Sequence, residues 1–255
     1  MSYYDLSKPE REALSLSMKN RISEDLQRGT DTHILSYFSD GDTYIRKNAY
    51  LHIGRLYAEM PALQAEIIRR LHVWMESADE KVRQTVVNGA GEIGKQAFGD
   101  VVYFFDTGLT DHHHSVRNAV IGSVKKMGDK NPEPVLAWAE KYLQHPDKEI
   151  RREICHGIEL RGRTHPQDIL PLLRRLEFDG TARVKNTLIH VLGQIAYKKG
   201  CLQTVVQDLK NWENTALVSA ALREIIDVHE RYSPFAVLTR EQAETYIRRE
   251  ADGYL

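Results

Sequence analysis

The segment Asp147-Lys148-Glu149-Ile150-Arg151 ends in a β-branched residue followed by arginine, and this pair recurs along the chain. In chain order the corresponding pairs are Ile45-Arg46, Val82-Arg83, Val116-Arg117, Ile150-Arg151, Val184-Lys185 and Val218-Ser219. The second residues of successive pairs lie 37, 34, 34, 34 and 34 positions apart. A fixed period of this length is typical of proteins built from stacked structural repeats. The sequence therefore predicts one repeated unit, copied over roughly residues 31–231.

The apolar pattern predicts two helices in each repeat. In the fourth repeat the first helix begins near Pro132 and ends at the turn His145-Pro146, because proline disfavours helix at the residue before it. In the second helix, apolar residues recur three and seven positions after the basic residue, on the same face as the β-branched residue. They are Ala49, Val86, Val120, Ile154, Leu188 and Leu222, then Ile53, Ala90, Val124, Ile158, Leu192 and Ile226. We expect this face to be buried.

The remaining helices follow from capping signals and apolar spacing. We expect first helices near 31–39, 61–77, 99–109, 132–144, 166–176 and 201–212. A leading helix over 8–28 would begin after Ser7 and stop at Gly29. A closing helix over about 239–251 would begin with a capping box of Thr239 and Gln242. The sequence contains no evident linker or low-complexity tract, so residues 1–255 are predicted to form a single domain.

Composition limits the class of protein. The 255 residues are 42% hydrophobic and 28% charged, with a net charge of −1. No apolar run approaches the length of a membrane span, and the polar N-terminus is unlike a secretory or transit signal. Cys155 and Cys201 have no paired spacing, which favours a cytoplasmic protein without disulfides or a thiolate metal site. A net charge near zero counts mildly against non-specific nucleic-acid binding, so the distribution of charge has to decide.

An aspartate precedes the arginine by four positions in three repeats, at Asp42, Asp79 and Asp147. This pattern resembles the HEAT repeat, whose turn Asp and helix-start Arg form a ladder between neighbours. The third, fifth and sixth repeats depart from it, with His113, Thr181 and Thr215 at that position. The resemblance implies an all-α, right-handed α-α superhelix of about six helix pairs with capping helices. It also favours a structural role for the repeated arginines over a role in binding a ligand.

Residues 131–212 resemble the HEAT-like DNA alkylation-repair glycosylases more narrowly. The similar segments are Asn131-Pro132, Trp138, His145-Pro146, Ile150 to Glu153, Asp179 to Asn186 and Trp212. In that family a concave basic cleft holds duplex DNA, and tryptophans with a carboxylate surround the alkylated nucleotide. The family pairs a Trp with an Asp one turn later, whereas Trp138 is followed one turn later by Tyr142. The catalytic candidates are therefore Trp138 and Glu159, and the implied excision of alkylated purines needs no cofactor or metal.

The face of the second helices that the apolar stripe leaves free is rich in cations and amides. Second helices line the concave side of a HEAT solenoid, so this face is the predicted binding surface. Such donors suit phosphate oxygens. The predicted nucleic-acid-binding residues are Lys47, Lys95, Lys125, Lys126, Arg152, His156 and Arg163. The alternative is an ordinary solvated helix face.

Four further clusters have structural interpretations. His156 and Glu159, three residues apart, form either an acid–base pair or a local surface contact. The run His112-His113-His114 is not expected to bind a metal, because three consecutive residues do not readily face one ion. The tryptophans are expected to pack in the core. The glycines at positions 89, 91 and 94 lie within a second helix, where they are expected to allow close packing.

Three functions remain open from the sequence. The leading hypothesis is a module that binds duplex DNA along its concave face. The alternatives are a scaffold for a protein partner and a DNA glycosylase. A continuous positive groove would favour nucleic acid, and an apolar or mixed groove would favour a protein. No cofactor, metal or membrane is expected.

Overall fold

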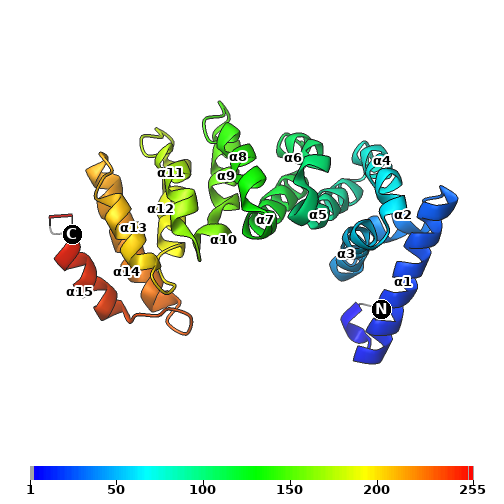
Figure 1. Cartoon of the computed structure of the whole chain (residues 1–255), viewed down its shortest axis with the longest axis horizontal. Helices are drawn as coiled ribbons and strands as arrows, with labels where there is room; N and C mark the ends of the chain where they lie inside the picture. The colour runs from blue at the N-terminus through cyan, green and yellow to red at the C-terminus, as the bar shows by residue number, and fades with distance from the viewer. Residues whose placement is uncertain (1–2, 252, 255) are drawn as a thin grey trace. The chain divides into compact units, whose positions relative to one another are not determined.

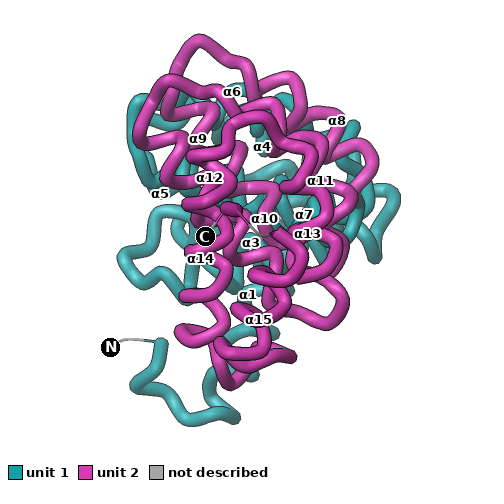
Figure 2. Tube along the Cα trace, turned by 90° about the vertical axis from the view of Figure 1, so that its left-hand side faces the viewer, with its two compact units in different colours: residues 1–131 teal, residues 132–255 magenta. Residues whose placement is uncertain are grey.

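The structure is a computed structural model that describes residues 3–251 and 253–254 (Figure 1). Every regular element among these residues is a helix, which confirms the predicted all-α class. No described helix is both long and apolar enough to cross a membrane. The chain divides into two compact units, Met1–Asn131 and Pro132–Leu255 (Figure 2). The single-domain interpretation stays a prediction.

Unit 1 consists of a leading helix and three helix pairs. The helix α1 spans Lys8–Arg28 and is followed by α2 (Thr32–Phe38) with α3 (Thr43–Glu59), α4 (Gln64–Met75) with α5 (Glu80–Ala97), and α6 (Val102–Leu109) with α7 (His114–Lys130). Short 3-10 turns lie at Tyr3–Asp5, Pro61–Leu63 and Phe98–Asp100. Helices α1, α3, α5 and α7 pack in that order, each against the next. One face of the unit is therefore built from second helices.

Unit 2 has a similar plan. Its helices are α8 (Pro132–Tyr142), α9 (Lys148–Gly157), α10 (Glu159–Gly162), α11 (Pro166–Arg174), α12 (Ala182–Gln194), α13 (Cys201–Leu209), α14 (Thr215–Arg231) and α15 (Arg240–Glu250). The second helices α9, α12 and α14 pack in succession, and α15 closes the row against α14. The second helix of the fourth repeat was expected to continue through Ile158. Instead α9 ends at Gly157, and Glu159 begins the short helix α10.

Capping side chains fix where the helices begin. The side chains of Asp42, Asp79 and Asp147 each accept a hydrogen bond from the backbone N–H two residues later, at 2.8, 2.7 and 2.8 Å. This is the capping that short polar residues provide at helix starts. The capping box of Thr239 and Gln242 is confirmed, and Gly29 ends α1 in the left-handed conformation at φ 69°. Glycine adopts that conformation without steric cost.

The predicted apolar stripe forms the core. All twelve residues at the three- and seven-residue positions are buried, from Ala49 at 0% to Ile226 at 7% exposure. The tryptophans are buried as well, which confirms that they pack in the core. Burying apolar surface is the dominant favourable term in folding. The register of the repeats therefore follows from this stripe.

Glycines allow two second helices to approach closely. A Cβ on Gly91 of α5 would lie 2.6 Å from the Cβ of Ser123 on α7. A Cβ on Gly54 of α3 would lie 2.5 Å from the Cβ of Glu92 on α5. Both distances are too short for real carbon atoms, so a side chain at either position would push the helices apart. The packing role expected for the glycines of α5 is confirmed at Gly91.

The repeated arginines hold the turns together, but with a partner other than the one expected. The HEAT-like pattern suggested that the aspartates four residues before each arginine form the ladder, yet Asp79 and Asp147 cap helices instead. Arg83 pairs with Asp111 at 2.7 Å, and Arg151 pairs with Asp179 at 2.6 Å, each 28 residues further along the chain. The sequence interpretation missed these partners because it looked for the aspartate at the capping position, which His113 and Thr181 occupy in the following repeats.

The arginines share a second contact. In all four, Nη1 donates to the carbonyl oxygen six residues earlier, on Asp40, Ser77, Asp111 and His145 respectively. A guanidinium offers five donors in a fixed geometry, so one side chain can bind both a carbonyl and a carboxylate. The structural role predicted for these arginines is confirmed.

Candidate functional site

Three predicted lysines of unit 1 lie near one another, and two of them pair with one carboxylate. They are Lys47 on α3, Lys95 on α5 and Lys126 on α7, and we refer to them as the lysine cluster. Lys95 forms an ion pair with Glu92, and Lys126 Nζ lies 3.8 Å from the other oxygen of the same carboxylate. Lys47 is exposed and close enough for its charge to affect Lys126. Two of the three cations thus share one anion, and the charge of the third, Lys47, acts on Lys126.

The surroundings of Lys126 oppose its charge. Burial lowers its pKa, the charge of Glu92 acts in the opposite direction, and the charges of Lys95 and Lys47 lower the pKa further. Lys126 Nζ also lies 5.7 Å from the centroid of the Tyr50 ring, within the range of a cation–π contact. An anion bound here would relieve the repulsion among the lysines. Lys125, the neighbouring residue in α7, is half-buried.

In unit 2 the predicted residues His156 and Arg163 meet at a buried carboxylate. The Glu159 side chain is only 2% exposed, and its Oε2 lies 3.1 Å from His156 Nδ1. Arg163 donates its Nε to Oε1 of Glu159 at 3.0 Å and its Nη2 to Gln194 at 3.1 Å. Glu159 begins α10 and is about one helical turn from both His156 and Arg163 along the chain. The pairing of His156 with Glu159 predicted from their spacing is therefore present.

A pocket of about 310 Å³ lies beside this carboxylate. It is lined by Arg152, His156, Arg183, Asn186, Thr187 and His190, which come from α9 and α12. The two arginines of the rim share one acid, because Glu149 lies 2.9 Å from Arg152 and 3.0 Å from Arg183. Burial lowers the pKa of His190, with Glu159 and Glu224 acting against the shift and the neighbouring His156 acting with it.

The charge of this face differs between the units. In unit 2 the predicted cations Arg152, His156 and Arg163 each lie within 4 Å of a glutamate. Paired charges in close contact largely cancel at a distance. In unit 1 Lys95 and Lys126 share a single carboxylate, that of Glu92, and the charge of Lys47 acts on Lys126. The predicted cations of unit 2 are thus each paired with a carboxylate, whereas two predicted lysines of unit 1 share one.

The two catalytic candidates lie in different surroundings. Trp138 is 3% exposed, and its ring lies 5.0 Å from that of Tyr142 in the same helix. Glu159 is buried beside cationic side chains. An aromatic face that is covered by protein cannot stack on a base unless the surface opens. Catalysis by these residues therefore stays a prediction.

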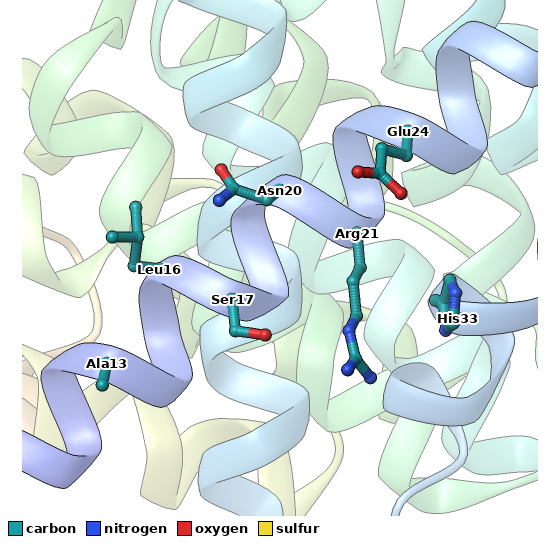
Figure 3. Close-up of a pocket in the computed structure, with 7 residues that line it drawn as sticks. All are labelled: Ala13, Leu16, Ser17, Asn20, Arg21, Glu24 and His33. Atoms are coloured by element: carbon teal, nitrogen blue, oxygen red, sulfur yellow. The ribbon is translucent and has the colours of Figure 1, made fainter.

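A separate hollow lies on α1 and the start of α2, within unit 1. It has a volume of about 580 Å³ and is lined by Ala13, Leu16, Ser17, Asn20, Arg21, Glu24 and His33. Figure 3 shows that the lining residues follow one face of α1, with Arg21 directed toward the side where His33 lies. It combines one cation, one anion and an exposed leucine. None of the predicted binding residues lines it.

Comparison with known proteins bears on the fold. No family model and no curated protein matches the sequence. The structure is similar to AlkD2 from Streptococcus mutans, with a TM-score of 0.53 and 16% identity over 80% of this chain and 97% of that chain. The chain has a HEAT-like fold. It is also similar to Kap95p, with a TM-score of 0.51 and 14% identity over 97% of this chain and 36% of that chain. The predicted resemblance to HEAT repeats and to the alkylation-repair group is confirmed at the level of fold.

Some residues of the unit 2 pocket were not predicted as site residues. His190 is the most informative, because it lies 34 residues after His156, which is one repeat period. Residues one period apart occupy the same position on neighbouring second helices, and the two imidazole rings lie 6.0 Å apart. Comparison of equivalent positions between repeats places His190, like His156, on the free face of its second helix, but it was not among the residues predicted to bind.

Proposed function

We propose that this HEAT-like protein binds duplex nucleic acid, and that the lysine cluster of unit 1 provides its main phosphate contacts. The observation that carries the proposal is that Lys95 and Lys126, from two successive second helices, share Glu92, while Lys47 of the preceding second helix adds its charge near Lys126. Like charges brought together on a folded surface repel one another, so the arrangement favours an anionic ligand. Lysine ammonium groups are common partners of phosphate oxygens.

The spacing of the helices supports a polymeric anion. Each lysine comes from a different repeat, so the cations form a row across α3, α5 and α7 rather than a closed pocket. A nucleic-acid backbone presents phosphates in such a row. Affinity would come mainly from the release of condensed counterions, and sequence specificity would be low. The likeness in fold to AlkD2 is consistent with this function.

In this proposal unit 2 contributes less to phosphate binding. Arg152 and Arg163 lie against glutamates, and a phosphate would have to compete with these carboxylates. Of the predicted binding residues, those of unit 1 are therefore expected to contribute more to phosphate binding than Arg152 and Arg163. Single substitutions of these two arginines should reduce affinity less than substitution of Lys126.

A protein partner is the second candidate function. The mixed charge of the unit 2 surface favours it, because alternating cations and carboxylates suit a polypeptide better than a uniform polyanion. One solved structure similar over 97% of this chain is that of Kap95p, whose binding induces the switch loops of RanGDP to adopt the GTP-bound conformation. A scaffold of this kind would bind through a long surface formed by many repeats.

The test is a binding measurement at two salt concentrations. A labelled 20-bp duplex is titrated with the full chain in about 50 mM and about 150 mM salt, over which phosphate binding weakens strongly. The variant Lys125→Ala/Lys126→Ala should bind more weakly without a change in sequence preference. Its salt slope should fall by about one unit for each phosphate contact that is lost.

The control removes the same charge elsewhere in unit 1. Lys8→Ala/Lys130→Ala also deletes two lysines, whose side chains are 82% and 67% exposed. It should bind almost as the unmodified chain does. Equal weakening in both variants would show only a general charge effect. Unchanged binding in Lys125→Ala/Lys126→Ala would contradict the proposal, and no binding at low salt would favour the protein scaffold. Release of methylated purines from alkylated duplex DNA would establish the glycosylase alternative.

A further inference from the structure

Three side chains with metal-binding atoms converge in unit 2. They are His156 on α9, Glu159 on α10 and His190 on α12, and one nitrogen or oxygen atom from each lies within 4.8 Å of the others. The carboxylate is buried, whereas the imidazoles are 33% and 39% exposed. The two histidines line the pocket of about 310 Å³, so an ion in the pocket could reach them from solvent.

The chemistry of the three groups suits one class of ion. Imidazole nitrogen and carboxylate oxygen together are common ligands of zinc and of related divalent transition metals. Sites with three protein ligands usually leave the fourth position open to water or substrate. The ligand atoms need to move closer together, because a bound zinc lies only about 2.0–2.2 Å from each nitrogen or oxygen. Histidine side chains that are partly exposed can make such a movement.

Neighbouring groups hold the ligands in place. Arg163 Nε donates to Glu159 Oε1 at 3.0 Å, which leaves Oε2 on the side that faces His156. His190 Nδ1 lies 3.7 Å from Glu224, so a carboxylate stands beside the ring nitrogen that a metal bound at Nε2 would leave unused. Ligating histidines commonly have a carboxylate behind them in this way. The nearby positive charge of Arg152 is offset by Glu149 at 2.9 Å.

We propose that His156, Glu159 and His190 form a binding site for one divalent transition-metal ion of the zinc class, with a coordination position open to the pocket. The sequence analysis predicts no metal site, because the only histidine cluster visible along the chain is 112–114. The site arises from two residues on neighbouring turns and a third that lies one repeat later. It does not depend on nucleic-acid binding, since it uses only unit 2.

The test uses the metal alone as the probe. The full chain is treated with a chelator, dialysed and titrated with Zn²⁺ by calorimetry, and Co²⁺ is added separately to follow its visible absorption. We expect one ion per chain at this site and a higher unfolding temperature with Zn²⁺, because binding stabilises the folded state. His156→Gln and His190→Gln should each weaken Zn²⁺ binding by more than about tenfold, since even loss of an outer partner costs about 10–100-fold.

The control removes the competing surface histidines. His112→Gln/His114→Gln leaves the proposed site intact and should keep both the affinity and the shift in unfolding temperature. The histidine variants are preferred to a change of Glu159, because loss of that buried carboxylate would leave Arg163 without its partner and could unfold the chain. The proposal is overturned if the chain shows no saturable Zn²⁺ binding, or if His156→Gln/His190→Gln binds Zn²⁺ with unchanged affinity. Loss of binding only in the His112→Gln/His114→Gln control would overturn it as well.

Discussion

Arg83 on α5 binds both carboxylate oxygens of Asp111, with Nε and Nη2 at 2.7 and 3.0 Å. The side chains are only 7% and 6% exposed, so the pair links two successive turns within the interior of unit 1. Asp111 also accepts a hydrogen bond from the backbone N–H of His113, which begins the next second helix. One carboxylate therefore connects the start of one second helix to the start of the next.

Removing Asp111 should destabilise the protein more than removing Asp79. Asp111→Ala leaves the buried guanidinium of Arg83 without its carboxylate, and breaking such a pair costs about 3–5 kcal/mol. Asp79→Ala removes a helix cap, which costs about 1 kcal/mol. Urea unfolding followed by circular dichroism gives both free energies. If Asp79→Ala were the more damaging change, the partner assigned to Arg83 would be wrong.

Acid should destabilise unit 1 through His52. Burial and the charge of Arg55 lower the pKa of this imidazole from its ordinary value of 6.5 to about 4, with Ser15 opposing the shift. Because the folded state then binds its proton less readily than the unfolded chain, stability is complete above pH 6.5. It falls as the pH drops from 6.5 toward 4. The urea midpoint measured across this range should fall less steeply in His52→Gln than in the unmodified chain.

A second acid transition should follow at lower pH. Burial is the largest single influence on the pKa of Asp111 and of Asp179 and would raise both values. The hydrogen bonds and charges of Arg83 and Arg151, together with backbone hydrogen bonds from His113 and Thr181, outweigh it and hold both pKa values below the ordinary 3.8. Their contribution to stability is present above that value and is lost as the pH falls through the lowered pKa values. Arg83→Leu should remove the part of this pH-dependent stability that comes from Asp111. A pH titration of unfolding that shows equal slopes below pH 4 in both proteins would contradict this assignment.

Two glycine substitutions should act in opposite directions. Gly91→Ala places a methyl group 2.6 Å from Ser123 Cβ, and overpacking of this kind costs about 1–3 kcal/mol. Gly122→Ala on α7 meets no atom within 4 Å and should stabilise the helix by about 0.5–1 kcal/mol. Thermal unfolding separates the two. Adding Ser123→Gly to Gly91→Ala should recover part of the loss, because it removes the clashing carbon; strict additivity of the two changes would count against the contact.

Neither cysteine should react in the folded protein. Cys155 and Cys201 are 0% and 2% exposed, and burial raises the pKa of both thiols. Because the thiolate is the reactive form, a thiol reagent at neutral pH should modify them only after unfolding. Counting modified thiols with and without denaturant measures this. Rapid modification of either cysteine in the native protein would show that its surroundings open readily.

The alkylation-repair resemblance illustrates the limit of transferring function by pattern. The segments around Trp138 correctly indicated a fold that the likeness to AlkD2 confirms. They did not indicate how accessible the aromatic side chain is, and Trp138 is almost completely covered. A fold is specified by many buried positions together, whereas a catalytic site depends on a few exposed ones. At 14–16% identity to the similar structures, the fold can persist without the catalytic site.

The sequence by itself determined the helices, their order and their buried faces. A 34-residue period with an apolar stripe in register admits few other solutions, because each apolar face must be covered by the next repeat. Capping signals at Ser7, Gly29 and Thr239 located the ends of the row, because caps act through residues that are close in the chain. These features depend on local spacing, which a single sequence records directly.

Tertiary structure alone decided which charges meet. The pairing of Arg83 with Asp111, the sharing of Glu92 by Lys95 and Lys126, and the convergence of His190 on Glu159 join residues from different helices. The residues that the sequence predicts as one cationic binding surface form the lysine cluster in unit 1 and a set of ion pairs in unit 2. Long side chains extend across the gap between helices. Whether the charge of such a side chain is neutralised therefore depends on which partners the packing brings within about 4 Å. That distance is fixed by the folded chain and is not recorded in the spacing of its residues.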